Sequence, residues 1–307
     1  MEQSNIPIIY QNHHVLIVNK PAGLVVHPTY KHAQGTLWNM LLEDLERQGS
    51  DGWCPPDLPD EPGWERAPAH IRVMLREQRL ARFWQEEGWL PRPVLLHRLD
   101  KDTSGVLALA RTGLACRHIA RQFNMHTIVK TYLAVVRRAA PAWAQPRAPF
   151  TVTLTRASGA AEQLTQPLDL ALYQGASLML DGPLQRDPAD RRRCIVGPDG
   201  QEARTRVQVK AAWDDYALLE VQPVTGRTHQ IRAHMAAAGY ALVGDPTYAP
   251  LAEPGSSAAA LARQFLHASS LALRDYPANC PRTFVAPLPA DLADWLRVYA
   301  PTIRTAF

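Results

Sequence analysis

The chain has 307 residues, of which 20% are charged, and its formal net charge is +4 at pH 7. This length is sufficient to bury a full core, as one large domain or two modest ones. The mild charge excludes a protein held on nucleic acid by bulk charge alone, so any affinity for RNA must come from a local basic face and from shape.

The cysteines and the first residues of the chain indicate in which cellular compartment the protein works. The four cysteines lie far apart with no CxxC pair, which argues against a zinc knuckle or a short disulfide framework and fits a reducing compartment. The polar start lacks the basic region and long apolar run of a signal peptide. No apolar run approaches the roughly 18 residues that span a bilayer. We therefore expect a soluble, cytoplasmic protein with no membrane partner.

The first third of the chain predicts short strands and helices. Residues 14–19 and 24–27 are typical of two strands joined by a Lys-Pro-Ala-Gly turn. Residues 35–48 have apolar side chains at helical spacing, which predicts an amphipathic helix. Residues 49–92 begin rich in Pro, Asp and Glu and continue as an Arg-rich helical stretch, which we interpret as an insertion carrying one helix. Its arginines indicate either a solvated helix face or an RNA-contacting lobe.

A polar segment at residues 97–105 lies between two short apolar runs of strand length, which predicts a loop between two buried strands. Asp100 then lies at the edge of a core. Charges near a core cost several kcal/mol unless they are paired, which favours a functional role for Asp100 and Arg98. For residues 102–105, including Thr103, a turn held by backbone hydrogen bonds is the simpler interpretation.

The middle of the chain predicts a helix at residues 114–125 and a strand at 128–136. Residues 139–201 alternate Pro-rich, Gly-rich and charged stretches, for which loops and short strands are the default. The three consecutive arginines at 191–193 are typical of a solvated patch.

A predicted hairpin, formed by residues 203–209 and 216–221, leads into residues 226–234, where a strand ends and a helix begins. Gly239 is typical of the C-cap of that helix. Two further elements, a late strand and a C-terminal packing helix, are expected at residues 265–273 and 289–299.

Two histidines of the 226–234 segment could suggest a metal site. His229 and His234 are five residues apart, which places them off a common helical face, unlike HExxH, and no acidic cluster accompanies them. We expect no metal.

Several segments resemble the motifs of one known family. HRLDKDTSG at residues 97–105 resembles HRLDxxTSG, the central motif of the RluA/RluD family of RNA pseudouridine synthases. Nine residues matched at this density are a specific signal. Further likenesses are NKPAGLVVHP, KTYLAVV, GRTHQIRAH followed by GDPTY, and LHA, at residues 19–28, 130–136, 226–234, 244–248 and 266–268.

The resemblance covers the chain from about Val15 to His267 and implies a fold. The expected fold class is α+β, with a mixed, mostly antiparallel central sheet flanked by helices and loops. We expect a single catalytic domain over residues 1–307, with insertions at about 49–92 and 156–201. No separate N-terminal RNA-binding domain is expected before the first motif.

The resemblance also implies roles for residues. Asp100 stands at the family's catalytic aspartate, Arg227 at the arginine that pairs with it, and Tyr132 at a tyrosine whose ring packs against the target base. We therefore expect these three residues to be catalytic. The expected substrate-binding residues are Arg98, which occupies the space of the flipped-out nucleotide, Ile231, an apolar wall of the pocket, His97, Thr103 and Lys20, the last being a structural or RNA-facing residue.

The implied activity is the isomerisation of a specific uridine in structured RNA, ribosomal or transfer RNA, to pseudouridine. The bond from ribose to N1 breaks, the base turns, and the ribose rejoins C5, without redox change, hydrolysis or group transfer. This reaction requires a carboxylate, a cation that keeps it ionised and a dry slot for the uracil. We expect no cofactor, RNA as the partner, and a monomer.

Two other functions fit parts of the sequence. Ser104, His97 and Asp100 could form the triad of a hydrolase, although triad members normally come from separate loops and no GxSxG elbow is present. A non-catalytic RNA-binding module could use the same scaffold. Mere binding would not need Asp100, Tyr132 and Arg227 together, which favours the enzyme.

Overall fold

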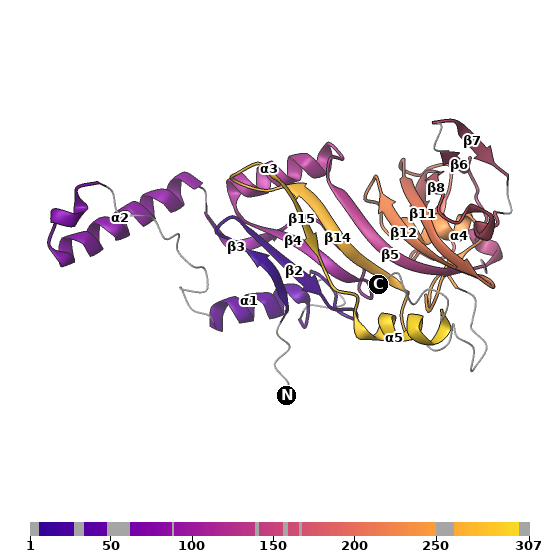
Figure 1. Cartoon of the computed structure of the whole chain (residues 1–307), viewed down its shortest axis with the longest axis horizontal. Coiled ribbons are helices and arrows are strands. Elements are labelled where there is room, and N and C mark those ends of the chain that lie inside the picture. The colour runs from indigo at the N-terminus through magenta and orange to yellow at the C-terminus, as the bar shows by residue number, and fades with distance from the viewer. Residues whose placement is uncertain are drawn as a thin grey trace. The chain divides into compact units, whose positions relative to one another are not determined.

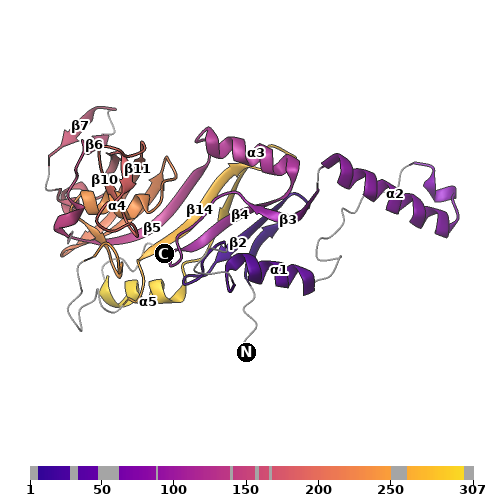
Figure 2. The same cartoon turned by 180° about the vertical axis from the view of Figure 1, so that it is seen from behind.

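The computed structural model describes most of the chain (Figures 1 and 2). The described residues are 6–27, 34–47, 62–87, 89–138, 141–155, 159–165, 168–249 and 261–300. The chain divides into two compact units. Unit 1 comprises Met1–Lys101, Val106–Ile128 and Leu273–Phe284, and unit 2 comprises Asp102–Gly105, Val129–Ala272 and Val285–Phe307. Because the chain passes between the units several times, neither is one continuous segment, and the single catalytic domain stays a prediction.

Unit 1 combines a small sheet with helices. Its strands are β1 (Ile8–Gln11), β2 (Val15–Lys20), β3 (Trp89–Leu95) and β4 (Ser104–Thr112), of which the first two residues of β4 belong to unit 2. Its helices are α1 (Leu37–Arg47), α2 (Ala69–Glu87) and α3 (Gly113–Asn124), with a short 3-10 turn η2 (Trp64–Arg66). β1 pairs antiparallel with β2, β2 lies beside β4, and β3 pairs antiparallel with β4.

The helices of unit 1 begin where side chains cap them. The Thr112 hydroxyl accepts a hydrogen bond from Ala115 N at the start of α3, and the Thr36 hydroxyl accepts one from Asn39 N at the start of α1. Both helices were predicted from periodicity, and the prediction is confirmed. The Arg-rich helix predicted within residues 49–92 is α2, whereas residues 48–61 and 88 lie outside the described residues.

The strand expected at residues 24–27 is wrong. These residues are irregular, and the carbonyls of Val25 and Val26 accept hydrogen bonds from Leu37 N and Trp38 N at 2.9 and 3.1 Å. The first amides of a helix have no partners within the helix, so the start of α1 draws this segment out of a sheet. β3 is also less buried than expected, because Val94 is 39% exposed.

Unit 2 contains an antiparallel sheet with the order β14-β5-β12-β11-β8-β6-β7. One parallel pairing joins His267 and Ala268 of β14 to Ser104 and Gly105 of β4. The strands are β5 (Val129–Arg137), β6 (Thr151–Thr155), β7 (Ala161–Leu164), β8 (Ser177–Asp181), β11 (Arg204–Trp213), β12 (Tyr216–Pro223) and β14 (Leu266–Arg274), the last two residues of which lie in unit 1. The expected mixed, mostly antiparallel sheet is confirmed.

The remaining elements complete unit 2. Its helices are α4 (Gln230–Ala237) and α5 (Ala290–Tyr299), with 3-10 turns η3 (Ala142–Ala144) and η4 (Leu170–Tyr173). The shorter strands are β9 (Leu184–Arg186) and β10 (Cys194–Val196), which pair with each other, β13 (Ala241–Leu242), which pairs with β5, and β15 (Pro281–Val285), which pairs with β14 and lies mostly in unit 1. Residues 139–201 therefore contain the expected short strands.

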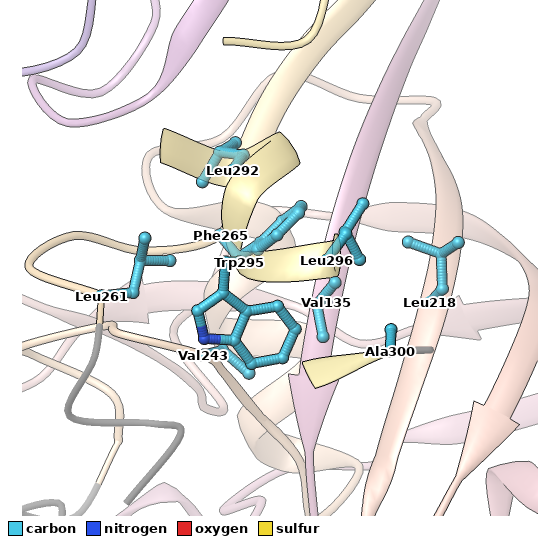
Figure 3. Packing of buried hydrophobic residues seen from close by; sticks show 9 residues of the cluster. All are labelled: Val135, Leu218, Val243, Leu261, Phe265, Leu292, Trp295, Leu296 and Ala300. Atoms are coloured by element: carbon cyan, nitrogen blue, oxygen red, sulfur yellow. The ribbon is translucent and has the colours of Figure 1, made fainter. Parts of the chain in front are cut away.

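The C-terminal helix α5 packs on the sheet of unit 2 through its apolar face (Figure 3). Trp295 is 3% exposed, and its ring contacts Phe265 at a centroid distance of 5.6 Å. Leu292 and Leu296 join the same cluster. The packing helix expected at residues 289–299 is confirmed, and β11, β12 and β14 confirm the hairpin and the late strand.

The three consecutive arginines were expected to form a solvated patch, which is wrong for Arg193. Its side chain is largely buried, its Nε donates to Asp187 Oδ2 at 2.7 Å, and its guanidinium lies 3.5 Å from the centroid of the Trp143 ring. The Asp187 side chain is fully buried. A buried carboxylate requires a cation beside it, and Arg193 supplies that cation.

Candidate active site

The loop that carries Asp100 begins in unit 1, directly after β3. Leu99 is buried and anchors the loop, Arg98 is exposed, and Asp100 is half-buried. His97 Nε2 accepts a hydrogen bond from Ala108 N at 3.1 Å, so this nitrogen carries no proton. The loop thus presents an arginine and a carboxylate in an accessible position on a fixed base.

Lys20 binds the backbone of the same loop. Its side chain is fully buried, and its Nζ donates to Pro21 O and to Lys101 O, both at 2.8 Å. The second bond fixes the peptide group between Lys101 and Asp102, one residue beyond Asp100. Of the two roles expected for Lys20, this burial favours the structural one.

The end of the loop, in unit 2, is clamped to the segment around the start of β14. Thr103 is buried, and its hydroxyl accepts a hydrogen bond from Gln264 Nε2 at 3.3 Å, while Arg263 Nη1 donates to Asp102 O at 3.1 Å. Gly105 has φ +118°, and a Cβ there would lie 2.1 Å from Ala268 O. Only glycine fits this position. The turn expected at residues 102–105 is wrong for Ser104 and Gly105, which begin β4, and the Thr103 hydroxyl binds a distant side chain instead of a nearby backbone amide.

Ser104, the first residue of β4, is buried and has a partner other than the His97 of the hydrolase alternative. Ser104 Oγ lies 3.0 Å from His267 Nδ1, and His267 Nε2 lies 3.2 Å from Ala286 O. Burial lowers the pKa of His267. Both side chains are buried, whereas a nucleophile needs access to substrate, so this pair argues for a structural role and against a triad with His97.

In unit 2, β5 carries Tyr132 next to the loop that contains Arg227. Tyr132 is buried and pairs with Val221 of β12, from which the chain runs on into that loop. Lys130 lies two residues earlier on β5, hence on the same face as Tyr132. Its Nζ donates to Thr225 O at 3.0 Å, and burial lowers its pKa to about 8. β5 is thereby joined directly to the Arg227 loop.

The side chain of Gln230 fixes the backbone of the Arg227 loop. Its Oε1 accepts hydrogen bonds from Thr225 Oγ1 at 2.6 Å and from Arg227 N at 3.0 Å. Its Nε2 donates to Arg204 O at 2.8 Å and to Thr205 Oγ1 at 3.0 Å. Every hydrogen-bonding position of this buried amide is used, so the loop has little freedom at its centre.

The Arg227 side chain is exposed, and its Nε donates to Glu202 O at 3.0 Å. Ile231 is buried in the first turn of α4. Tyr132, Arg227 and Ile231 all lie in unit 2, on β5, on the loop after β12 and in the first turn of α4. Lys20, His97, Arg98 and Asp100 lie in unit 1 and Thr103 in unit 2, and the expected pairing of Asp100 with Arg227 stays a prediction.

Motif residues at and beyond α4 build a buried network rather than a site. Arg232 donates to both oxygens of Asp245, at 2.7 and 2.8 Å, and its guanidinium lies 4.8 Å from the Tyr248 ring centroid. His234 Nδ1 lies 2.8 Å from Thr205 Oγ1, and its Nε2 lies 3.0 Å from Gly182 O. Both nitrogens of His234 thus have partners within the protein.

Three supporting contacts were missed from sequence: those of Lys130, of Gln230 and of the buried ion pair at Arg232. All three residues belong to segments that resemble the family, but their partners lie outside these short segments or depend on the fold, and the partner of Lys130 is 95 residues away. Among the described residues, no group of three histidine, cysteine, aspartate or glutamate side chains could hold a metal ion. No helix of the described part is both long and apolar enough to cross a bilayer.

Comparison with known proteins identifies the family. Residues 14–237 match the model of the RNA pseudouridylate synthase family. The chain therefore belongs to this family. Two human structures, RNA pseudouridylate synthase domain containing 4 and 1, share its fold with TM-scores of 0.54 and 0.53, at 21% and 19% identity. These structures cover 95% and 100% of this chain, which covers 92% and 97% of theirs.

Curated relatives are similar to this chain over most of its length. An uncharacterized RNA pseudouridine synthase of Chloroflexus aurantiacus is 37% identical over 279 residues, which are 91% of this chain and 65% of that protein. Ribosomal large subunit pseudouridine synthase D of Xanthomonas campestris is 31% identical over 293 residues, or 93% of this chain and 66% of that protein. The chain thus spans about two thirds of the length of these relatives.

Proposed function

We propose that this chain is an RNA pseudouridine synthase, an isomerase that converts a uridine in structured RNA to pseudouridine. The observation that carries the proposal is the family match over residues 14–237. Within the matched region, Asp100 lies half-buried on a loop whose backbone is bound by Lys20. A carboxylate that must reach a reacting atom needs a loop that is fixed but accessible, and Asp100 lies on such a loop. Membership in the family alone would fit a binding module equally well.

The proposed reaction uses side chains alone. The bond between ribose C1′ and N1 of the uracil breaks, the base turns, and C1′ bonds to C5; the proton of C5 leaves and N1 gains one. Asp100 acts as nucleophile or base, and Arg227 keeps it ionised. The ring of Tyr132 and the side chain of Ile231 form the walls that hold the free uracil.

We assign Arg98 a role in base flipping, the movement of the target base out of its stack. Taking a base out of its stack costs a few kcal/mol, and a stacking contact is worth about 1 to 3 kcal/mol per base. Arg98 is exposed on the loop, two residues from Asp100. Its planar guanidinium can fill the vacated stack and offset much of the cost of flipping.

Ribosomal RNA is the substrate class that we propose first. Relatives from Xanthomonas campestris and Nitrosomonas europaea, each 31% identical to this chain, are named ribosomal large subunit pseudouridine synthase D. Transfer RNA is the second substrate to test, because structured loops of either RNA can present an unstacked uridine.

Tritium release from C5-labelled uridine tests the activity and the role of Asp100 together. Unmodified transcripts of bacterial large-subunit ribosomal RNA and of transfer RNA serve as substrates. We expect release from at least one transcript with the wild type and none with Asp100→Asn, because an amide is neither a base nor a useful nucleophile. The variant should still bind the RNA.

Asp102→Asn is the matched control, since it removes a carboxylate from the same loop while leaving the Asp102 carbonyl that Arg263 binds. It should release tritium at close to the wild-type rate. Residual activity of Asp100→Asn near the wild-type level would dismiss the catalytic assignment. Binding without release by the wild type would instead support the RNA-binding module.

A further inference from the structure

Strand β10, labelled in Figure 2, forms a hairpin with β9. The sequence of this hairpin is rich in arginine. We name residues 184–196 the arginine hairpin. The hairpin with the adjoining Arg147 contains five arginines and two aspartates, which leaves three positive charges in excess, whereas the formal net charge of all 307 residues is +4. The arginines are Arg147, Arg186, Arg191, Arg192 and Arg193, and the aspartates are Asp187 and Asp190.

The interior of the hairpin tip is braced by one buried carboxylate. Asp187 accepts hydrogen bonds from Arg193 Nε at 2.7 Å and from Ala189 N at 3.0 Å, and Arg147 lies 3.6 Å away. The Asp187 amide donates to Arg193 O at 3.1 Å. These contacts hold the turn in one conformation, so its backbone needs little ordering when a ligand binds.

The strand that follows the tip is anchored to the core of unit 2. The Tyr248 hydroxyl accepts a hydrogen bond from Cys194 N at 2.7 Å and donates one to Cys194 O at 2.9 Å. Cys194 and Val196 pack in a cluster with Ala233 of α4. The hairpin is therefore part of the unit and not a loose loop.

The outward side chains of the tip are arginines. Arg186 and Arg191 are exposed, and the Arg192 side chain is 85% exposed. Arg186 Nη1 donates to Arg191 O at 3.1 Å, which keeps the arginines together. Arg192 forms a bidentate ion pair with Asp190, with Nε 2.9 Å from Oδ1 and Nη2 2.7 Å from Oδ2. A phosphate group can bind the remaining N–H groups of its guanidinium while this pair stays in place.

The base of the hairpin lies next to the Arg227 loop. Leu184 and Gln201 exchange two backbone hydrogen bonds, each 2.9 Å long, and the carbonyl of the next residue, Glu202, accepts the bond from Arg227 Nε. An RNA strand whose uridine reaches Arg227 would therefore continue toward the hairpin. Guanidinium groups bind phosphates through paired hydrogen bonds.

We propose that the arginine hairpin is an RNA-docking surface whose exposed arginines, Arg191 and Arg192, bind phosphate groups of the substrate strand next to the target uridine. The inference rests on the proposed function, because it takes the substrate to be RNA. It assigns the positive surface of unit 2 to positioning the strand, while Tyr132 and Arg227 act on the nucleoside.

The salt dependence of RNA binding tests this proposal. The probe is the transcript of large-subunit ribosomal RNA or of transfer RNA, whichever the wild type binds more tightly. The double variant Arg191→Ala/Arg192→Ala should weaken binding roughly tenfold at 0.1 M KCl. The slope of log Kd against log salt should fall by about 1.4 to 1.8, since each phosphate contact contributes about 0.7 to 0.9.

A matched pair of single variants separates a local contact from overall charge. Arg192→Ala and Arg297→Ala each remove an exposed arginine that is ion-paired to an aspartate of its own segment, Asp190 or Asp294. Only the first should raise the KM for RNA and lower the salt slope, with kcat unchanged. Equal effects of the two variants, or no effect of the double variant, would overturn the proposal.

The outcomes also separate this proposal from the proposed function. If the wild type binds RNA through the hairpin but releases no tritium, the docking surface stands and the isomerase proposal fails. If tritium is released at wild-type KM by the double variant, the isomerase stands and the docking surface fails. Wild-type protein that binds neither transcript overturns the docking surface.

Discussion

At the scale of one residue, Lys130 joins a charged side chain on β5 to the loop that contains Arg227. Its backbone pairs with Leu271 of β14, and its part-buried ammonium donates to Thr225 O, two residues before Arg227. Burial disfavours the protonated form, which is why the pKa of Lys130 falls to about 8. Titratable groups with such shifts cluster at functional sites.

We predict that Lys130→Met lowers turnover by about 10- to 100-fold, since a hydrogen bond to a charged group is worth about 1.5 to 3 kcal/mol and its loss frees the Arg227 loop. Binding of RNA should change little. In the wild type, activity should decline as pH rises through 8, because the lowered pKa makes Lys130 lose its proton there. Tritium-release rates from pH 6.5 to 9.5 measure both effects.

Lys130→Arg is the control for that prediction. It keeps a donor for Thr225 O, and its guanidinium stays charged over the whole range. It should restore most of the turnover and abolish the decline above pH 8. An alkaline decline of the same shape in Lys130→Arg would assign the titration to another group.

At the scale of elements, helix α5 offers a clean test of packing. Trp295 contacts the rings of Phe265 and Tyr216 and belongs to the apolar cluster of Figure 3. Trp295→Ala should lower the free energy of unfolding by about 3 to 5 kcal/mol, because it removes a large buried side chain and leaves a cavity. Urea unfolding followed by circular dichroism measures this loss.

Val298→Ala is the companion variant on the other face of α5. Val298 is 60% exposed, so its truncation should change the free energy of unfolding by less than about 0.5 kcal/mol. Comparable losses in the two variants would mean that the helix is stabilised by its own propensity and not by packing on the sheet.

Elements with strong periodicity and caps were predictable from sequence. α1, α3 and α5 repeat apolar residues at helical spacing, and the hairpin of β11 and β12 has a polar turn between apolar runs. The strand expected at residues 24–27 failed for a reason outside its own pattern, because two of its carbonyls bind the start of α1.

The sequence suggests candidate site residues but not the contacts that support them. Tyr132, Arg227 and Ile231 stand in segments that resemble family motifs, all three lie in unit 2, and their roles stay predictions. Lys130 and Gln230 also lie in such segments, but their contacts could not be read there, since the bond from Lys130 to Thr225 depends on the register of β5 against β12. No hairpin turn joins β5 to β12, so turn geometry does not reveal their register.

At the scale of the whole molecule, a buried histidine ties folding to pH. His234 is fully buried between Thr205 and Gly182, and burial lowers its pKa from 6.5 to about 4. Between these two values the unfolded chain binds a proton that the folded chain does not. The contribution is therefore fully present above pH 6.5 and is lost as pH falls toward 4.

We predict that lowering the pH from 7 to 5 costs the wild type about 2 kcal/mol through His234 alone, by the linkage of the two pKa values. His234→Gln keeps an acceptor and a donor but does not titrate, so its unfolding free energy should fall by about that much less over the same range. Urea midpoints of both proteins at pH 7, 6 and 5 provide the measurement. Because burial also lowers the pKa of His267, the variant should retain part of the decline, and parallel curves for the two proteins would contradict the neutral, buried state of His234.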